Sequence, residues 1–70
     1  MEVKLGDIVK FRLVNGFKDH TGEIIRVIPD SEKDPHVTSL LNYDYVVAAA
    51  DGLGRMYELN IHKREIMEVL

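Results

Sequence analysis

The 70-residue chain contains no cysteine, so it offers no disulfide, thiolate ligand or thiol nucleophile. It also lacks a long apolar run: the longest, residues 45–50, is far shorter than the ~20 residues that a membrane-spanning helix needs. Its first seven residues lack the basic segment and apolar stretch of an export signal. We therefore expect one domain over residues 1–70, in the cytoplasm and without membrane association.

A surplus of positive charge is also missing, since the net charge is −3. Nucleic-acid binders usually carry a basic surplus, because neutralising phosphates supplies much of their affinity. The charge is uneven: residues 1–28 carry five cations against four carboxylates, whereas residues 29–60 carry two against six. An ordinary mixed-charge surface explains this pattern too. If instead the asymmetry serves binding, the acidic region favours a protein partner over bare RNA.

Size limits what the chain can do. A domain of 8.0 kDa buries only roughly 60% of its unfolded surface. That leaves little room for a substrate pocket and a separate cofactor site, so we expect no enzymatic activity, catalytic residues or cofactor. Short apolar runs separated by turn signals favour an all-β fold. The expected strands cover residues 8–14, 22–28, 43–50, 55–59 and 66–70.

In the first run, Val9, Phe11 and Leu13 share one face at period two. The run over residues 22–28 does not alternate cleanly, which indicates a bulge. Asn15-Gly16 and residues 51–54 are typical of turns.

Two further turns are expected to be helical. In the 30–42 connection, Asp34 is a helix cap and Pro35 suits the first helical position, with Val37, Leu40 and Leu41 on one face. Asn60 is expected to cap a 3-10 turn before the last strand. The sequence thus predicts a small five-stranded SH3-like barrel, with a short helical turn in the 30–42 connection and a 3-10 turn before the last strand.

Two segments resemble a known family. Gly6-Asp7-x-Val9-x-Phe11, followed by residues 15–27 (NGFKDHTGEIIRV), resembles the KOW motif that opens the SH3-like barrel of the NusG C-terminal domain. Residues 54–59, with the later Ile66, resemble the last two strands of that domain. Position 19 is Asp where the motif often has Gly, and the 30–42 connection is longer than the family's usual return. The resemblance implies a transcription- or translation-associated setting.

A second resemblance, to plasmid-borne type II dihydrofolate reductases, would imply an enzyme with one active pore built by four chains. Tyr45-x-Val47, a glycine-containing turn and the last strand are similar to the end of those barrels. Their pore depends on a Val-Gln-Ile-Tyr segment, whereas this chain has Arg55-Met56-Tyr57-Glu58. Glu58 would repel the cofactor phosphates, so this is the less favoured alternative.

No metal site is expected. His20, His36 and His62 fall in predicted loops or turns, and none has a partner at the close spacing of a local zinc site. Surface histidines are the default interpretation. Asp30, Glu32 and Asp34 alternate like the start of a calcium loop, but His36 and Leu41 replace the glycine and glutamate that such a loop needs.

Candidate contact residues come from loops and strand ends. Phe17 lies in the first loop beside Lys18, and flat aromatic side chains give large contact areas at low entropy cost. Tyr43 and Tyr45 share a strand face, so each is either a contact or part of the core. The expected partner-binding residues are Phe17, Lys18, Arg26, Arg55 and Tyr45.

We therefore expect a non-catalytic protein-binding module, monomeric or weakly self-associating, that makes contact through the 15–20 loop and the 30–42 connection. The alternative is a domain that binds RNA or the ribosome directly through residues 10–26. Its candidate contacts are Lys10, Arg12, Lys18 and Arg26.

Overall fold

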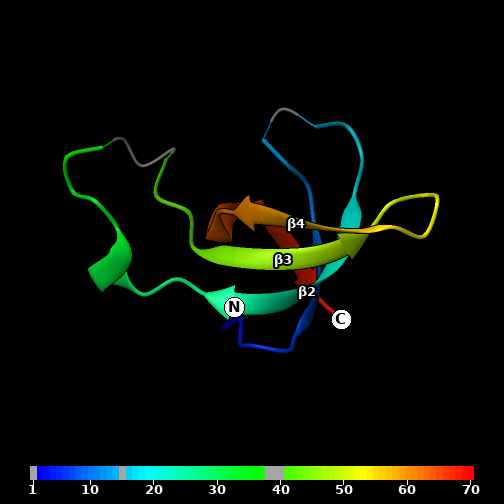
Figure 1. Ribbon diagram of the computed structural model, residues 1–70, viewed down its shortest axis with the longest axis horizontal. Coiled ribbons are helices and arrows are strands. Elements are labelled where there is room, and N and C mark those ends of the chain that lie inside the picture. Colours follow the sequence, from blue (N-terminus) through cyan, green and yellow to red (C-terminus); the bar gives the residue numbers. More distant parts are fainter. Residues whose placement is uncertain (1, 15, 38–40) are drawn as a thin grey trace.

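Five antiparallel strands form one sheet in the computed structural model, which describes residues 2–14, 16–37 and 41–70 (Figure 1). The strands are β1 (Ile8–Phe11), β2 (His20–Val27), β3 (Tyr45–Ala50), β4 (Met56–Ile61) and β5 (Ile66–Val69), and the 3-10 turns are η1 (Asp30–Glu32) and η3 (Lys63–Glu65). Their order in the sheet is β4-β3-β2-β1-β5. The all-β class, the helical turn in the 30–42 connection and the 3-10 turn before the last strand are confirmed. Closure of the sheet into a barrel stays a prediction.

The core lies on one face of this sheet. Val9 and Phe11 are fully buried while Lys10 between them is only half-buried, as the alternation in β1 predicts. Ile24, Val47 and Ile61 are buried from β2, β3 and β4. These side chains bring most of the sheet into one apolar cluster, to which Val3, Tyr45 and Ile66 also belong.

The predicted bulge in the second run is confirmed. Ile24 pairs with Val47 of β3, but the next paired residue of β2 is Arg26, opposite Val46. Ile25 is therefore the extra residue, and residues 25–27 are exposed after the bulge. The shift explains why the apolar residues of this segment do not alternate.

Gly22 lies where β2 and β3 approach most tightly. It is buried and pairs with Ala49, and a Cβ at this position would lie 2.7 Å from the backbone oxygen of Ala48. A real Cβ contact is not that short, so a residue without a side chain is required here. The neighbouring Ala49 is itself almost fully buried, at 2% exposure.

The hairpin between β3 and β4 forms at residues 51–54, as predicted. Asp51 Oδ1 accepts hydrogen bonds from the backbone amides of Leu53 (2.8 Å) and Arg55 (3.0 Å). Gly54 has a φ of +82°, which glycine adopts without strain. The hydrogen bonds from Arg55 and Leu53 hold the pKa of Asp51 below its usual value.

The helical turn of the 30–42 connection does not follow Asp34, the predicted helix cap. It covers Asp30–Glu32, whereas Asp34 accepts a 2.8 Å hydrogen bond from the His36 amide in a simple turn. Asn42 bonds both backbone groups of Asp34, at 3.0 and 2.8 Å, and so competes with helix formation there. Leu40, part of the predicted helix face, lies outside the described residues, as does Asn15 of the first predicted turn.

Asn60 is not the cap of the last turn. It lies inside β4, because the strand continues to Ile61, which is fully buried and pairs with Tyr45. The 3-10 turn η3 starts two residues later than predicted for an Asn60 cap, with His62 as its N-cap.

Candidate functional site

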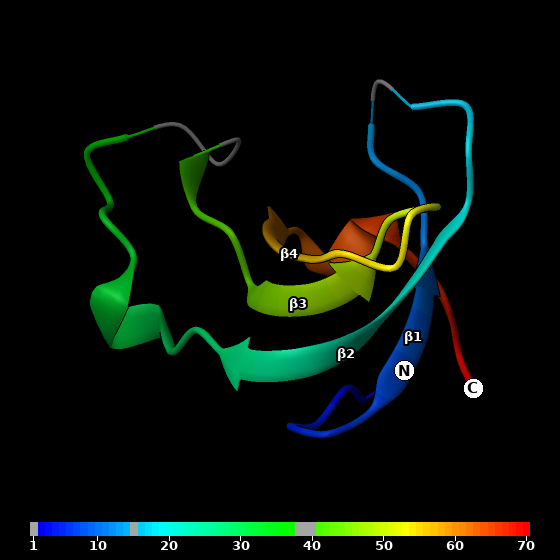
Figure 2. The same ribbon diagram turned by 45° about the vertical axis from the view of Figure 1, so that its right-hand side comes forward.

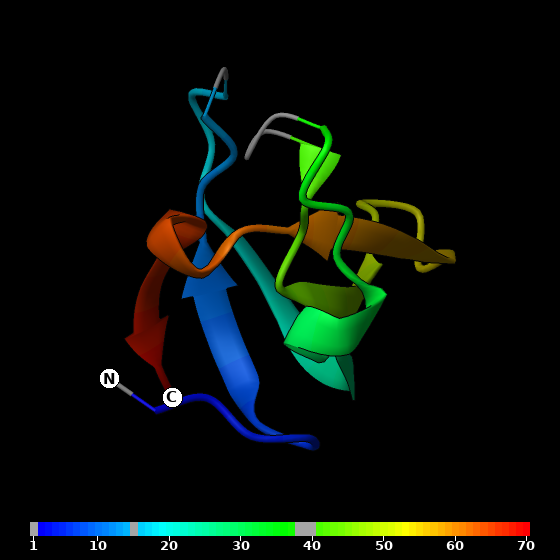
Figure 3. The same ribbon diagram turned by 90° about the vertical axis from the view of Figure 1, so that its left-hand side faces the viewer.

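The two longest connections extend from the sheet as two arms. The first arm is the described part of the β1–β2 connection, residues 12–14 and 16–19, and the second arm is the described part of the β2–β3 connection, residues 28–37 and 41–44. Figure 2 shows them on either side of the end of β4 and of η3, and Figure 3 shows the same arrangement from the side of the second arm. Residues far apart in sequence therefore meet at this end of the molecule.

An open groove of about 680 Å³ lies between the arms. We call it the apolar groove. Both arms, β4 and η3 contribute to its lining, which consists of Leu13, Val14, Gly16, Leu41, Tyr43, Leu59, Asn60, His62 and Glu65. Val14 and Leu41, one from each arm, are 61% and 63% exposed, so a partner entering the groove would cover them.

Glu65 attaches the first arm to η3. Its side chain is buried, with Oε1 accepting from the His62 amide at 2.7 Å and Oε2 from the Val14 amide at 3.0 Å. The backbone oxygen of Glu65 accepts from the Arg12 amide at 3.0 Å. One residue thus closes η3 and fixes the base of the first arm.

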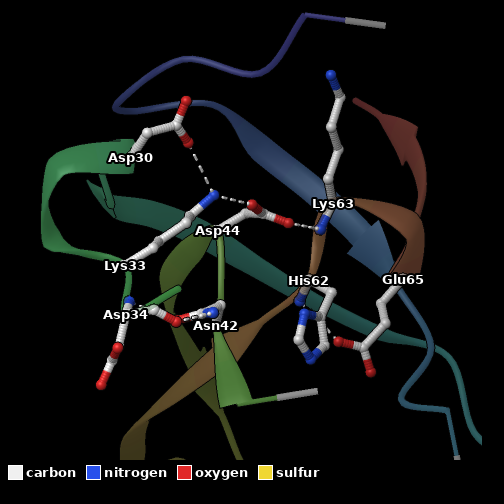
Figure 4. Close-up of polar contacts among 8 residues, drawn as sticks. All are labelled: Asp30, Lys33, Asp34, Asn42, Asp44, His62, Lys63 and Glu65. Atoms are coloured by element: carbon white, nitrogen blue, oxygen red, sulfur yellow. Dashed lines mark hydrogen bonds and ion pairs between the residues drawn. The ribbon is translucent and has the colours of Figure 1, made fainter. Parts of the chain in front are cut away.

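Asp44 does the same for the second arm. Its Oδ2 accepts from the Lys63 amide at 2.7 Å, and its Oδ1 accepts from Lys33 Nζ at 2.5 Å (Figure 4). Asp30 lies 3.3 Å from the same Lys33 nitrogen. The adjacent amides of His62 and Lys63 thus each bind one of these carboxylates, and the Glu65 carboxylate in turn binds the Val14 amide of the first arm.

These contacts favour the charged forms of both partners. Partial burial opposes ionisation of Asp44, but hydrogen bonds from Lys33 and from the Lys63 amide outweigh it, so the pKa of Asp44 lies below its usual value. The hydrogen bond to Asp44, with Asp30 nearby, raises the pKa of Lys33.

His62 is not a surface histidine, contrary to the default interpretation. It is only 5% exposed and stacks on Tyr43, with ring centroids 4.6 Å apart. His20 also stacks on a ring, that of Phe11, at 5.4 Å. The contact between His62 and Tyr43 joins η3 to the second arm in the wall of the apolar groove.

A second, smaller groove of about 240 Å³ lies next to the first. We call it the polar groove, since Arg26, Glu32, Lys33 and Asn42 line it together with Ile28. Leu41, Tyr43 and Asn60 line both grooves, so the two grooves lie next to each other and share these residues. The Asn60 side chain, exposed at this junction, makes no hydrogen bond among the described residues.

The predicted partner-binding residues do not form one cluster. Phe17 is 98% exposed in the first arm with Lys18 exposed beside it, but neither lines a groove. Arg26 lines the polar groove and pairs with Glu32. Arg55 lies at the opposite end of the β3–β4 hairpin, paired with Asp51 at 3.1 Å. Tyr45 is only 7% exposed and belongs to the core, which leaves it little surface for a partner; burial raises its pKa.

Two of the four candidate nucleic-acid contacts share one carboxylate. Arg12 contacts Asp19 Oδ1 through its terminal nitrogen at 2.6 Å and through Nε at 2.8 Å, and Lys10 Nζ lies 3.6 Å from Oδ2. The hydrogen bond from Arg12 holds the pKa of Asp19 below its usual value, although desolvation opposes it. Asp19 thereby reduces the net positive charge of the first arm.

The groove residues that sequence reasoning missed are mainly Asn60, His62 and Glu65. Only Glu65 has a local signal: a glutamate three residues after an N-cap is typical of a capping box, but His62 is an unusual N-cap. The sequence pattern predicts Leu13 and Leu59 as strand residues, and Leu59 does lie in β4. Their place in the lining of the groove depends on tertiary structure, which the pattern does not indicate.

Neither a metal site nor a membrane helix is found in the part of the chain that the structure describes. No three His, Asp or Glu side chains there are grouped so that they could hold a metal ion. No helix there is long and apolar enough to cross a bilayer. Comparisons with protein-family models, with curated proteins and with solved structures give no match for this chain.

Proposed function

We propose that the chain is a non-catalytic binding module that takes up a segment of another protein in the apolar groove. The observation that supports this most directly is the groove itself, with apolar side chains from both arms exposed at its mouth. Binding sites are typically concave and mostly apolar, with a few fixed polar groups. Glu65, Asp44 and the ring of His62 hold the walls in place, so little ordering is needed on binding.

The charge distribution supports a protein segment over a nucleic acid. Asp30, Glu32, Asp34 and Asp44 belong to the second arm, in whose sequence Lys33 is the one lysine or arginine. Phosphates would be repelled there. In the first arm, Asp19 pairs with two of the four cations that the alternative requires, Lys10 and Arg12. The resemblance to the KOW domain of NusG supports a cytoplasmic role in transcription or translation as part of this proposal.

Selection from a random peptide library displayed on phage tests the proposal without a known partner. Immobilised wild-type protein should enrich peptides that lose at least about tenfold in affinity, ~1.4 kcal/mol, when Val14 and Leu41 are both changed to Asp. Both side chains are exposed, so the double variant should fold. Leu53→Asp is the control, because Leu53 is 79% exposed in the hairpin and lines neither groove.

Two results would contradict the proposal. One is that no enriched peptide distinguishes the Val14/Leu41 variant from wild type. The other is that single-stranded RNA binds the wild-type protein with an affinity that falls steeply as salt rises and falls further in Lys10→Ala and Arg12→Ala, which would establish the nucleic-acid alternative.

A further inference from the structure

The strand β4 has a free edge. It stands at one end of the sheet order and, among the described residues, pairs with β3 alone. In an antiparallel ladder, residue pairs that exchange backbone hydrogen bonds alternate with pairs that do not. The Asp51 amide bonds the Arg55 carbonyl at 2.8 Å in the β3–β4 register, so every second residue from Arg55 onward bonds toward β3. The residues between them, whose backbone groups point away from β3, are Met56, Glu58 and Asn60.

Solvent reaches this edge of the sheet. Met56, Glu58 and Asn60 are all exposed, and their backbone groups have no hydrogen-bond partner among the described residues that face away from β3. Such an edge is a template for a further strand, because an extended segment can bond its free N–H and C=O groups whatever the sequence. Side-chain contacts beside the edge then determine which segment binds.

The apolar groove lies beside this edge. Leu59 and Asn60 of β4 both line it, although neighbouring residues of a strand point to opposite faces of the sheet. Leu59 packs against the core, whereas Asn60 is exposed. None of the described lining residues belongs to β3. A groove that reaches both side chains therefore lies past the edge of the strand, where Figure 1 shows the two arms reaching beyond β4 on the side away from β3.

Glu58 limits which chain can pair with the edge. It is the middle one of the three edge residues, and it makes no ion pair among the described residues. A second copy that paired antiparallel through the same residues would place Glu58 opposite Glu58, and like charges directly opposite each other are destabilising. The complement of Glu58 is a lysine or arginine of a different protein. The next residue of an added strand would lie opposite Leu59, on the core side, where an apolar side chain fits.

We infer that a partner segment adds to the free edge of β4 as a further strand, with an apolar side chain in the apolar groove and, next to it in sequence, a lysine or arginine opposite Glu58. This inference rests on the proposed function and adds the conformation of the bound segment and a specificity-determining residue. The backbone of β4 holds the segment, the groove selects its apolar residue, and Glu58 selects the neighbour of that residue.

Hydrogen exchange tests the strand addition with the peptides selected on the wild-type protein. Binding should slow exchange of the Glu58 and Asn60 amides by at least about tenfold, because both amides gain an acceptor. Methylation of single backbone nitrogens of a peptide should weaken binding about tenfold or more at every second residue and little at the residues between them. This alternation follows because only every second N–H of an added strand faces β4.

Glu58→Lys tests the charge preference. The selected peptides should share a lysine or arginine directly beside an apolar residue, and Glu58→Lys should weaken them about tenfold or more. Glu68→Lys is the matched control and should bind them like wild type, since Glu68 is exposed on β5 and lines neither groove. The thermal midpoints of both variants verify that they are folded.

Two groups of results would contradict the inference, and they differ in what they leave standing. Groove-dependent binding that leaves the Glu58 and Asn60 amides unprotected, or that Glu58→Lys does not weaken, would overturn the inference and leave the proposed function standing. Binding that Val14→Asp/Leu41→Asp does not reduce would overturn both.

Discussion

Single residues set the shape of this small domain, and Gly22 is the clearest case. It lies in a central strand at a point where the backbone of β3 occupies the space of a side chain. Gly52, in contrast, has no atom within 4 Å of a built Cβ, and its φ is not positive. Gly22 is therefore required because a side chain does not fit at its position, whereas Gly52 is an ordinary turn glycine with room for a side chain.

Gly22→Ala should lower the free energy of unfolding by about 1–3 kcal/mol, because the new methyl group meets the Ala48 carbonyl rather than a movable side chain. Urea unfolding followed by circular dichroism measures this. Gly52→Ala is the control and should lie within ~0.5 kcal/mol of wild type. Equal stability of the two variants would show that β2 and β3 can separate at no cost.

At the scale of elements, hydrogen bonds to a short turn hold segments together that a bigger domain would hold by packing against a larger core. The turn η3 has three residues, yet the carboxylates of Glu65 and Asp44 connect it to both arms. A buried amide left without its acceptor costs more than the average hydrogen bond is worth. The attachment points of the arms should thus be sensitive to substitutions that leave the sheet untouched.

Glu65→Ala removes the acceptor of the His62 and Val14 amides and should cost about 1–3 kcal/mol of stability. Amide hydrogen exchange should show faster exchange at those two amides than in wild type. Glu68→Ala, on the exposed side of β5, provides the comparison and should change neither quantity. Unchanged exchange at Val14 would mean that the first arm is held by other contacts.

Elements were predictable from the sequence to the extent that their cause is local. The alternation of Val9 and Phe11, the irregularity around Ile25 and the turn at Asp51 are short-range patterns, and the structure follows them. The errors at Asp34 and Asn60 have causes beyond the adjacent residues: pairing with Asn42, eight residues away, in one case, and burial of Ile61 against the core in the other. The apolar groove is lined by residues of four segments, so no pattern within a single segment predicts it.

On the scale of the whole molecule, carboxylates with lowered pKa values link stability to pH. Asp19, Asp44 and Asp51 all have a folded-state pKa below the usual value. The unfolded chain then binds more protons than the folded chain as the pH falls into this range. Stability is therefore full above the unfolded pKa and decreases as the pH falls through the folded values.

The free energy of unfolding should accordingly be constant near neutral pH and decrease steadily below about pH 5. Urea titrations at a series of pH values measure the slope. Asp44→Asn should be less stable at neutral pH and show a shallower acid decrease, since the contact with Lys33 no longer titrates with that carboxyl. The same slope in both proteins would show that Asp44 does not contribute to it.

The solution mass separates the functional alternatives for the whole molecule. A binding module of the proposed kind should run as an 8.0 kDa monomer, or a weakly associating species, in light scattering coupled to gel filtration. A stable tetramer with reductase activity would instead support the enzyme resemblance. The measurement should be repeated at several concentrations, because β4 and β5 lie at the ends of the sheet order and unpaired edges favour association.

The adjacent amides of His62 and Lys63 have a consequence for how such a domain can change its specificity. The second arm is attached to the Lys63 amide through Asp44, and the first arm to Glu65, whose carboxylate the His62 amide also binds, so both attachment points belong to η3 and its N-cap. We therefore expect that a substitution in one arm, away from its attachment point, leaves the attachment of the other arm unchanged. If the arms bind a partner as proposed, their sequences can then vary independently while η3 keeps their bases in place.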